Sequence, residues 1–188
     1  MKFPAASRRA GHRQNGFSLI EIMLVLLIMG LGVSLVALSV GGSDVSRRLY
    51  KAAEQFSALA KLATDQATLG SEPIGLVLVP AELDRPWEYY WQRYRDEQWQ
   101  DEAEPLQRRQ LDLDILLELE VQGEPVDLTQ VAENKGPPLP AIVFYPSGEA
   151  TPFLLTFASD ALPDEPQQVR GGIGGQIQWP AEQWHETY

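Results

Sequence analysis

A long run of apolar residues stands near the start of the chain. Residues 17–40 are apolar except for Glu21 and three serines, at positions 18, 34 and 39. The part from Ile22 to Val40 spans 19 residues. As a helix it measures about 28 Å, close to the ~30 Å thickness of bilayer hydrocarbon. The pattern predicts a membrane-spanning helix. The alternative is a helix buried in a soluble core, where so few polar positions are unusual.

After Gly41-Gly42 the apolar residues fall on one side only. Apolar residues recur there at intervals of three or four, which is typical of an amphipathic helix. They are Val45, Leu49, Ala52, Phe56, Leu59, Ala63 and Ala67. We expect this helix to pack on a globular head and to end at Gly70. A kink or short break is expected at the two glycines, where Ser43 or Asp44 would cap a new start.

The remaining sequence has the pattern of short strands separated by Gly- and Pro-rich turns, which predicts antiparallel sheets. Residues 111–121 alternate between apolar and mostly acidic positions, as in a half-buried strand. The charged stretch 95–104 is expected to form a solvated loop, and the glycine run 171–175 a tight hairpin or bulge. The predicted strands are 74–79, 88–94, 111–121, 141–145, 152–158, 168–170 and 176–179.

Composition excludes several classes of function. The 188 residues include 15 Lys and Arg against 26 Asp and Glu, a net charge of −11, which disfavours non-specific nucleic-acid binding. Cysteine is absent, which excludes disulfides, thiolate metal sites and cysteine nucleophiles. His12 and His185 are the only histidines, too few for a multi-histidine metal site. Asp160, Asp164 and Glu165 are interpreted as a solvated turn rather than a calcium loop. No cofactor is predicted.

Charge predicts the orientation of the membrane helix. Residues 1–16 contain four basic and no acidic residues, so this end should stay in the cytoplasm. The bases Arg47, Arg48 and Lys51 after the span oppose this, but they precede a long domain, for which the charge rule weakens. We therefore expect the head outside the cytoplasm.

A basic start followed by an apolar run also describes a cleaved secretory signal. Residues 37–39 (Ala-Leu-Ser) would even serve as its cleavage site. Against this, the apolar run exceeds the usual length of such signals. It also contains Glu21, whose carboxylate costs about 2.5–3.5 kcal/mol deep in lipid.

The hexapeptide from Gly16 to Glu21, GFSLIE, follows a short basic leader and precedes a continuous apolar helix. In this context it resembles the class III signal of type IV pilins and type II secretion pseudopilins. The resemblance implies that a prepilin peptidase cuts between Gly16 and Phe17, and that the new amino terminus at Phe17 is N-methylated. Glu21 matches the glutamate that the family carries at the fifth position of the mature chain.

Physical arguments support a role of Glu21 in subunit assembly. Cleavage creates an α-amine at Phe17, four residues before Glu21 and on the same helical face. The two charges either neutralise each other within one chain, or Glu21 meets the amine of a neighbouring subunit in a low-dielectric environment and sets the axial register. The alternative is that Glu21 only extends its carboxylate to the lipid headgroups.

The segment FYPSGE, residues 144–149, is similar to the F-x-P-x-G segment of H-type minor pseudopilins of type II secretion, within the type IV pilin-like superfamily. The resemblance implies an α+β fold, with a long N-terminal transmembrane and amphipathic helix packed on an antiparallel β-sheet head. The predicted parts are a cleaved leader (1–16), a transmembrane helix (17–41), its amphipathic continuation (42–70) and a periplasmic head (71–188).

The predicted function is that of a non-enzymatic minor subunit of a periplasmic pseudopilus, at or near its tip, which assists assembly and the export of folded proteins. The protein would lie in the bacterial inner membrane with a single span and its C-terminal head in the periplasm. The implied partners are other major and minor pseudopilins, the prepilin peptidase and the inner-membrane secretion platform. The alternatives are a minor pilin of a type IV pilus and, from another class, a signal-anchored periplasmic enzyme or carbohydrate-binding module.

Aromatic residues gather between positions 87 and 99 and present a further candidate surface. Strand alternation would bury about half of them in the core, and an exposed remainder would suit an interface with a sugar or a partner. They are Trp87, Tyr89, Tyr90, Trp91, Tyr94 and Trp99.

Overall fold

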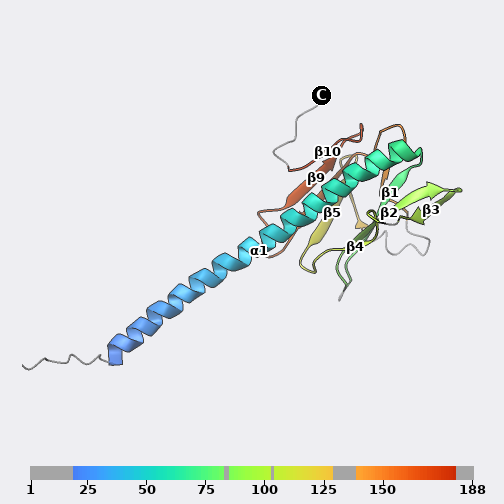
Figure 1. Cartoon of the computed structure of the whole chain (residues 1–188). Helices are drawn as coiled ribbons and strands as arrows, with labels where there is room; N and C mark the ends of the chain where they lie inside the picture. The colour runs from blue at the N-terminus through green and yellow to red at the C-terminus, as the bar shows by residue number, and fades with distance from the viewer. Residues whose placement is uncertain (1–18, 83–84, 103, 129–138, 181–188) are drawn as a thin grey trace, which may run out of the picture. The chain divides into compact units, whose positions relative to one another are not determined.

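The computed structural model describes residues 19–82, 85–102, 104–128 and 139–180, without the side chains of residues 30–43. Its contacts group into two units, Met1–Val40 and Gly41–Tyr188. The second unit contains the head, in which the last part of one helix packs on two β-sheets (Figure 1).

Helix α1 extends from Leu19 to Gly70 as one element. The expected break at Gly41-Gly42 is wrong, because both glycines are helical. Asp44, expected as a possible cap, instead pairs with Arg47 and Arg48 at i+3 and i+4, an arrangement that supports a continuous helix. The predicted end at Gly70 is confirmed.

The amphipathic pattern of α1 is confirmed by burial. Leu49, Phe56, Ala63 and Ala67 are fully buried, and Leu59 is nearly so. Val45 and Ala52 are partly buried against the same core, which also takes in Ala53 and Ala60.

Two antiparallel five-stranded sheets form the head. The first has the order β3-β2-β1-β7, with β4 also pairing with β2, and the second has the order β10-β9-β8-β5-β6. The strands of the first sheet are β1 Ile74–Val79, β2 Glu88–Arg95, β3 Gln98–Asp101, β4 Arg109–Gln110 and β7 Ile142–Phe144. Those of the second are β5 Leu116–Val121, β6 Glu124–Val126, β8 Phe153–Ala158, β9 Gln167–Gly171 and β10 Ile177–Gln178.

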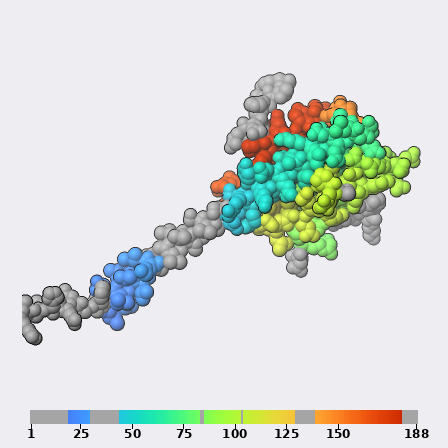
Figure 2. Space-filling model, in the orientation of Figure 1, coloured from blue at the N-terminus to red at the C-terminus, as the bar shows by residue number. Residues whose placement is uncertain are grey.

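Phe56 connects α1 to both sheets. Its ring centroid lies 5.6 Å from that of Tyr89 and 6.0 Å from that of Trp91, both on β2. On the second sheet it lies 6.2 Å from Phe153 and 5.7 Å from Phe157. The helix therefore covers the junction between the sheets, and in Figure 2 its cyan-to-green residues lie along the head beside the red strands near the C-terminus.

The predicted strand 111–121 is wrong in its first half, because β5 begins only at Leu116. The amide of Ile115 donates to the carbonyl of Asp112 in a turn, and Leu113 is 73% exposed. The alternating pattern predicted a strand whose acids face solvent. Instead, Asp112 and Asp114 pair with Arg48 of α1.

The stretch 95–104 is not the loop expected from its charge. Residues 98–101 form β3, which pairs with β2 through a hairpin. Asp96 and Glu97 turn the chain with φ values of 51° and 62°, the left-handed conformation that two-residue hairpins need at both central positions.

Two glycine turns meet at one end of the second sheet. The predicted hairpin at 171–175 is confirmed: it joins β9 to β10, and the amide of Gly175 donates to the carbonyl of Gly172. Gly175 has a φ of 73°, and a Cβ at this position would lie 2.3 Å from the carbonyl oxygen of Gly148. Gly148 itself has a φ of 87° in the turn between β7 and β8. Two segments far apart in sequence thus touch through their backbones.

Replacing Phe56 with alanine should lower the free energy of unfolding by about 3–5 kcal/mol, because it leaves a cavity that both sheets line. Urea unfolding of the detergent-solubilised full chain, followed by tryptophan fluorescence, measures this. Leu69→Ala on the same helix is the control and should change stability little, since Leu69 is 85% exposed. Equal effects of the two changes would contradict the central position of Phe56.

Replacing Gly175 with alanine should destabilise the head more than Gly123→Ala. Both glycines have positive φ, which costs an L-residue about 1–2 kcal/mol. Only at 175 does the added Cβ also strike a neighbouring backbone, whereas at Gly123 nothing lies within 4 Å. The same urea titration compares the two, and a smaller loss for Gly175→Ala would refute the close contact between the turns.

Candidate assembly site

The predicted assembly residues lie at the N-terminal end of α1. Glu21 is in the first helical turn, with an exposed side chain, where a carboxylate interacts favourably with the helix dipole. Gly16 and Phe17 lie outside the described residues. The roles of all three residues in cleavage, methylation and assembly therefore stay predictions.

Beside Glu21, α1 has large apolar side chains on every side. Their exposed fractions range from 42% at Val25 to 82% at Leu19, and the run continues to Met29. The predicted span 17–41 also includes residues 17–18 and 30–41, whose side chains lie outside the described part. Searched over its described residues, the structure has no helix that meets the length and hydropathy of a membrane span.

Within the head, Arg48 ties α1 to the loop before β5. Its guanidinium pairs with Asp44 of the same helix at 2.8 Å, with Asp112 at 3.5 Å and with Asp114. The hydrogen bond to Asp114 is the largest cause that raises the pKa of Arg48. The acidic alternation was the only sign of this cluster in the sequence, because Asp112 and Asp114 are more than sixty residues from Arg48.

Arg93 makes a second connection at the other end of the same helix segment. Its buried guanidinium donates to Glu102 of the β3 side at 2.7 Å and to Gln66 of α1 at 2.9 Å. One of its nitrogens would lie 2.7 Å from a Cβ at Gly70. A side chain at Gly70 would therefore displace the far end of Arg93, a contact that the sequence position alone did not reveal.

The aromatic residues from 87 to 99 are more buried than strand alternation predicts. Trp87, Tyr89, Tyr90 and Trp91 are all buried, because β2 is covered on both faces. Burial raises the pKa of Tyr89 to about 12. Of the six aromatics, only Tyr94 has an exposed side chain.

Arg108 covers one of these rings. Its guanidinium lies 4.0 Å from the ring centroid of Tyr90 and pairs with Glu88 at 2.9 Å. The hydrogen bond from Arg108 holds the pKa of Glu88 below its usual range. Tyr90 is therefore not available as a contact surface for a sugar or a partner.

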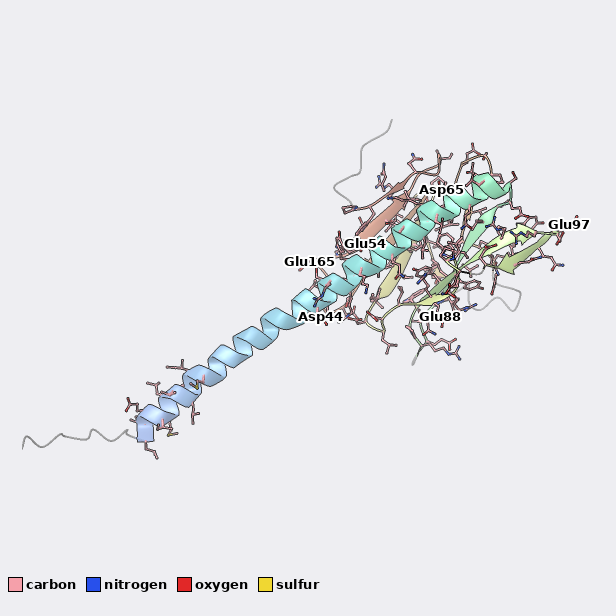
Figure 3. All side chains as sticks on the ribbon, viewed as in Figure 1. Asp44, Glu54, Asp65, Glu88, Glu97 and Glu165 are labelled. Carbon is pink, nitrogen blue, oxygen red and sulfur yellow. The ribbon has the colours of Figure 1, made fainter. Side chains whose placement is uncertain are left out.

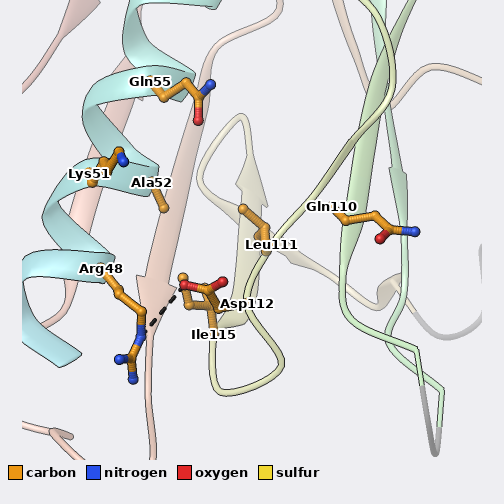
Figure 4. A pocket seen from close by; sticks show the side chains of 8 residues that line it. All are labelled: Arg48, Lys51, Ala52, Gln55, Gln110, Leu111, Asp112 and Ile115. Carbon is orange, nitrogen blue, oxygen red and sulfur yellow. Dashed lines mark ion pairs between the residues drawn. The ribbon is translucent and has the colours of Figure 1, made fainter. Parts of the chain in front are cut away.

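A pocket of about 240 Å³ lies between α1 and the loop that leads to β5 (Figure 4). Lys51, Ala52 and Gln55 line it from the helix, next to Arg48. Leu111 and Ile115 line it from the loop, and the pair Arg48–Asp112 connects the two sides. Gln110 and Asp112 also line it, so both sides of the pocket combine polar and apolar side chains.

The acidic side chains labelled in Figure 3 come from different elements of the head. The labelled carboxylates of Figure 3 lie on α1, on β2, in the turn before β3 and in the loop before β9. Among the residues that the structure describes, no three acidic or histidine side chains are placed to hold a metal ion.

Comparisons with known families match most of the chain. Residues 52–175 match the family described as type II transport protein GspH. Residues 11–41 match the prokaryotic N-terminal methylation motif.

Two curated relatives are both named type II secretion system protein H. The chain is 32% identical to type II secretion system protein H of Aeromonas hydrophila over 152 residues, covering 77% of this chain and 81% of the relative. It is 34% identical to the protein H of Pseudomonas aeruginosa over 154 residues, covering 77% and 83%.

A solved structure has the same fold. The crystal structure of the minor pseudopilin EPSH from the type II secretion system of Vibrio cholerae matches with a TM-score of 0.57 and 21% identity, covering 71% of this chain and 94% of that one. The two-sheet head behind a long helix is thus the pilin-like α+β arrangement expected from the sequence. The chain belongs to the GspH family of type II transport proteins and is a minor pseudopilin of a type II secretion system.

Proposed function

We propose that the chain is cut after Gly16, methylated at Phe17, and inserted into the pseudopilus through helix α1, at or near the filament tip, where it assists assembly and the export of folded proteins. The observation that carries this proposal is the run of exposed apolar side chains from Leu19 to Met29, with Glu21 in its first turn. Family membership already implies other pseudopilins as partners, together with a membrane anchor and a periplasmic location.

The apolar run needs cover from outside the chain. Surfaces of this size are stable only against lipid or another apolar surface. Before assembly, the bacterial inner membrane supplies that cover to a single-pass helix, with the C-terminal head in the periplasm. In the filament, helices of neighbouring subunits replace the lipid. The inner-membrane secretion platform is the partner that would transfer the helix from one to the other.

Glu21 sets the axial position of each subunit relative to its neighbour in the filament. A carboxylate among apolar side chains is costly unless a cation meets it. The α-amine that cleavage creates at Phe17 of an adjacent subunit is such a cation. Pairing between chains therefore favours one axial offset between subunits over all others.

Mass spectrometry of the mature protein should find a chain that begins with N-methylated Phe17. Gly16→Leu should leave the precursor uncut, because a side chain before the cleavage point obstructs a tight protease site. Gly11→Leu, in the same leader, is the control and should be processed normally. A mature chain that starts at Met1 or Val40 would reject the assignment of the leader.

Glu21→Val should abolish incorporation into the filament while the head stays folded, because the register-setting charge is lost. The amount of this chain in sheared, purified pseudopili measures incorporation, and limited proteolysis checks the head. Glu54→Val is the matched control: it removes an exposed acid from the same helix within the head and should assemble. Normal incorporation of Glu21→Val would remove the basis of the assembly role.

A further inference from the structure

Strand β3 lies at one end of the first sheet, and its far edge pairs with no strand that the structure describes. The amide of Glu102, directly after β3, donates to the carbonyl of Trp91 on β2, whereas the amide of Tyr94, opposite Trp99, donates toward β1. Backbone groups alternate in direction along a strand. The N–H and C=O groups of Trp99 and Asp101 therefore point away from β2, at an open edge.

Among the other described strands at sheet ends, each is closed or short. β7 is bordered by Thr151, whose amide donates to the carbonyl of Val143 and whose hydroxyl accepts from the Val143 amide. β6 contains Pro125, which has no N–H to donate, and β4 and β10 have two residues each. β3 contains neither lysine nor proline and pairs with β2 without a bulge, so it lacks these protections of an edge.

The side chains that accompany the open edge are aromatic and acidic. The ring of Trp99 lies 5.2 Å from that of Tyr94, its partner on β2. Asp101, two residues further, lies on the same face of the sheet. It is exposed, and the amide of Gln92 donates to its carboxylate at 2.9 Å. Glu97, in the turn before β3, lies at the tip of this hairpin (Figure 3).

We propose that β3 receives an extended segment of a partner protein as an added strand, with an apolar residue opposite Trp99 and a lysine or arginine opposite Asp101. Strand addition of this kind gains affinity from main-chain hydrogen bonds and specificity from alternate side chains. Aromatic–apolar and opposite-charge pairs on facing positions stabilise a strand pair. The inference goes beyond the proposed function, because it does not involve helix α1.

Charge disfavours a second copy of this chain as the added strand. In antiparallel pairing through the outward-pointing positions of β3, Asp101 would lie opposite Glu97, Trp99 or Asp101 of the other copy. Two of these arrangements place like charges directly opposite each other, which destabilises a strand pair, and the third places a carboxylate against an aromatic ring. The net charge of −11 also repels a second copy and attracts a basic segment.

A synthetic peptide of eight residues tests the strand addition. Threonine alternates in it with valine and lysine (TVTKTVTK), and its N-terminus has a fluorescein label whose anisotropy is followed while the detergent-solubilised full chain is added. N-methylation of the valine and lysine amides should weaken binding about tenfold or more, because the donors to β3 are lost. The peptide N-methylated at its threonines is the control and should bind like the unmodified one, since those amides point away from β3.

Asp101→Pro and Asp101→Ala form a matched pair of variants, because both remove the carboxylate but only proline removes the outward N–H. Asp101→Pro should weaken peptide binding about threefold or more beyond Asp101→Ala, and urea unfolding checks that both heads are folded. Equal binding by the two variants, equal binding of the two N-methylated peptides, or no binding to the wild-type chain would overturn the proposal. Dimers of the chain that Asp101→Pro separates would overturn it in favour of a second copy.

Discussion

The apolar side chains of helix α1 must be shielded from water, and the two parts of the helix meet this constraint in different ways. From Leu49 to Ala67, its apolar face is buried by the chain itself, with Phe56 between aromatic rings of both sheets. From Leu19 to Met29, its apolar side chains are exposed on all sides. The first stretch is complete within one molecule, whereas the second is stable only against lipid or other subunits. One helix therefore combines a folding core with an association surface, as a filament subunit requires.

Two arginines fix the head-bound stretch of α1 near its ends. Arg48 holds the loop before β5, and Arg93 holds the helix end at Gly70 together with the β2–β3 hairpin through Glu102. These contacts are worth less than the burial around Phe56, because Arg48 is partly exposed and a buried ion pair is costly to desolvate. Their contribution is geometric: they determine which loops lie next to the helix.

Sequence reasoning predicted the helix, its buried face and its end at Gly70, because a 3.6-residue period and a terminal glycine are local signals. Most strands and the glycine hairpin were found for the same reason. The errors occurred where distant residues decide the outcome. Leu113 fits an alternating strand by pattern, but pairing of its acidic neighbours with Arg48 holds the segment as a turn. Strand alternation predicted that about half of the aromatics from 87 to 99 would be buried, but β2 is covered on both faces and Arg108 lies over the ring of Tyr90. The pocket lined by Lys51 could not be predicted, since its two walls are separated by more than fifty residues.

Three non-glycine residues in tight turns of the head adopt a backbone conformation that lowers stability. Ser71, which follows the last turn of α1, has a φ of 57°, and Asp96 and Glu97 adopt similar left-handed conformations. Such conformations cost side-chain-bearing residues free energy that glycine does not pay. Replacing these residues with glycine should therefore stabilise the head. A more heat-resistant head for structural or biotechnological work is accessible by changing only these turn residues.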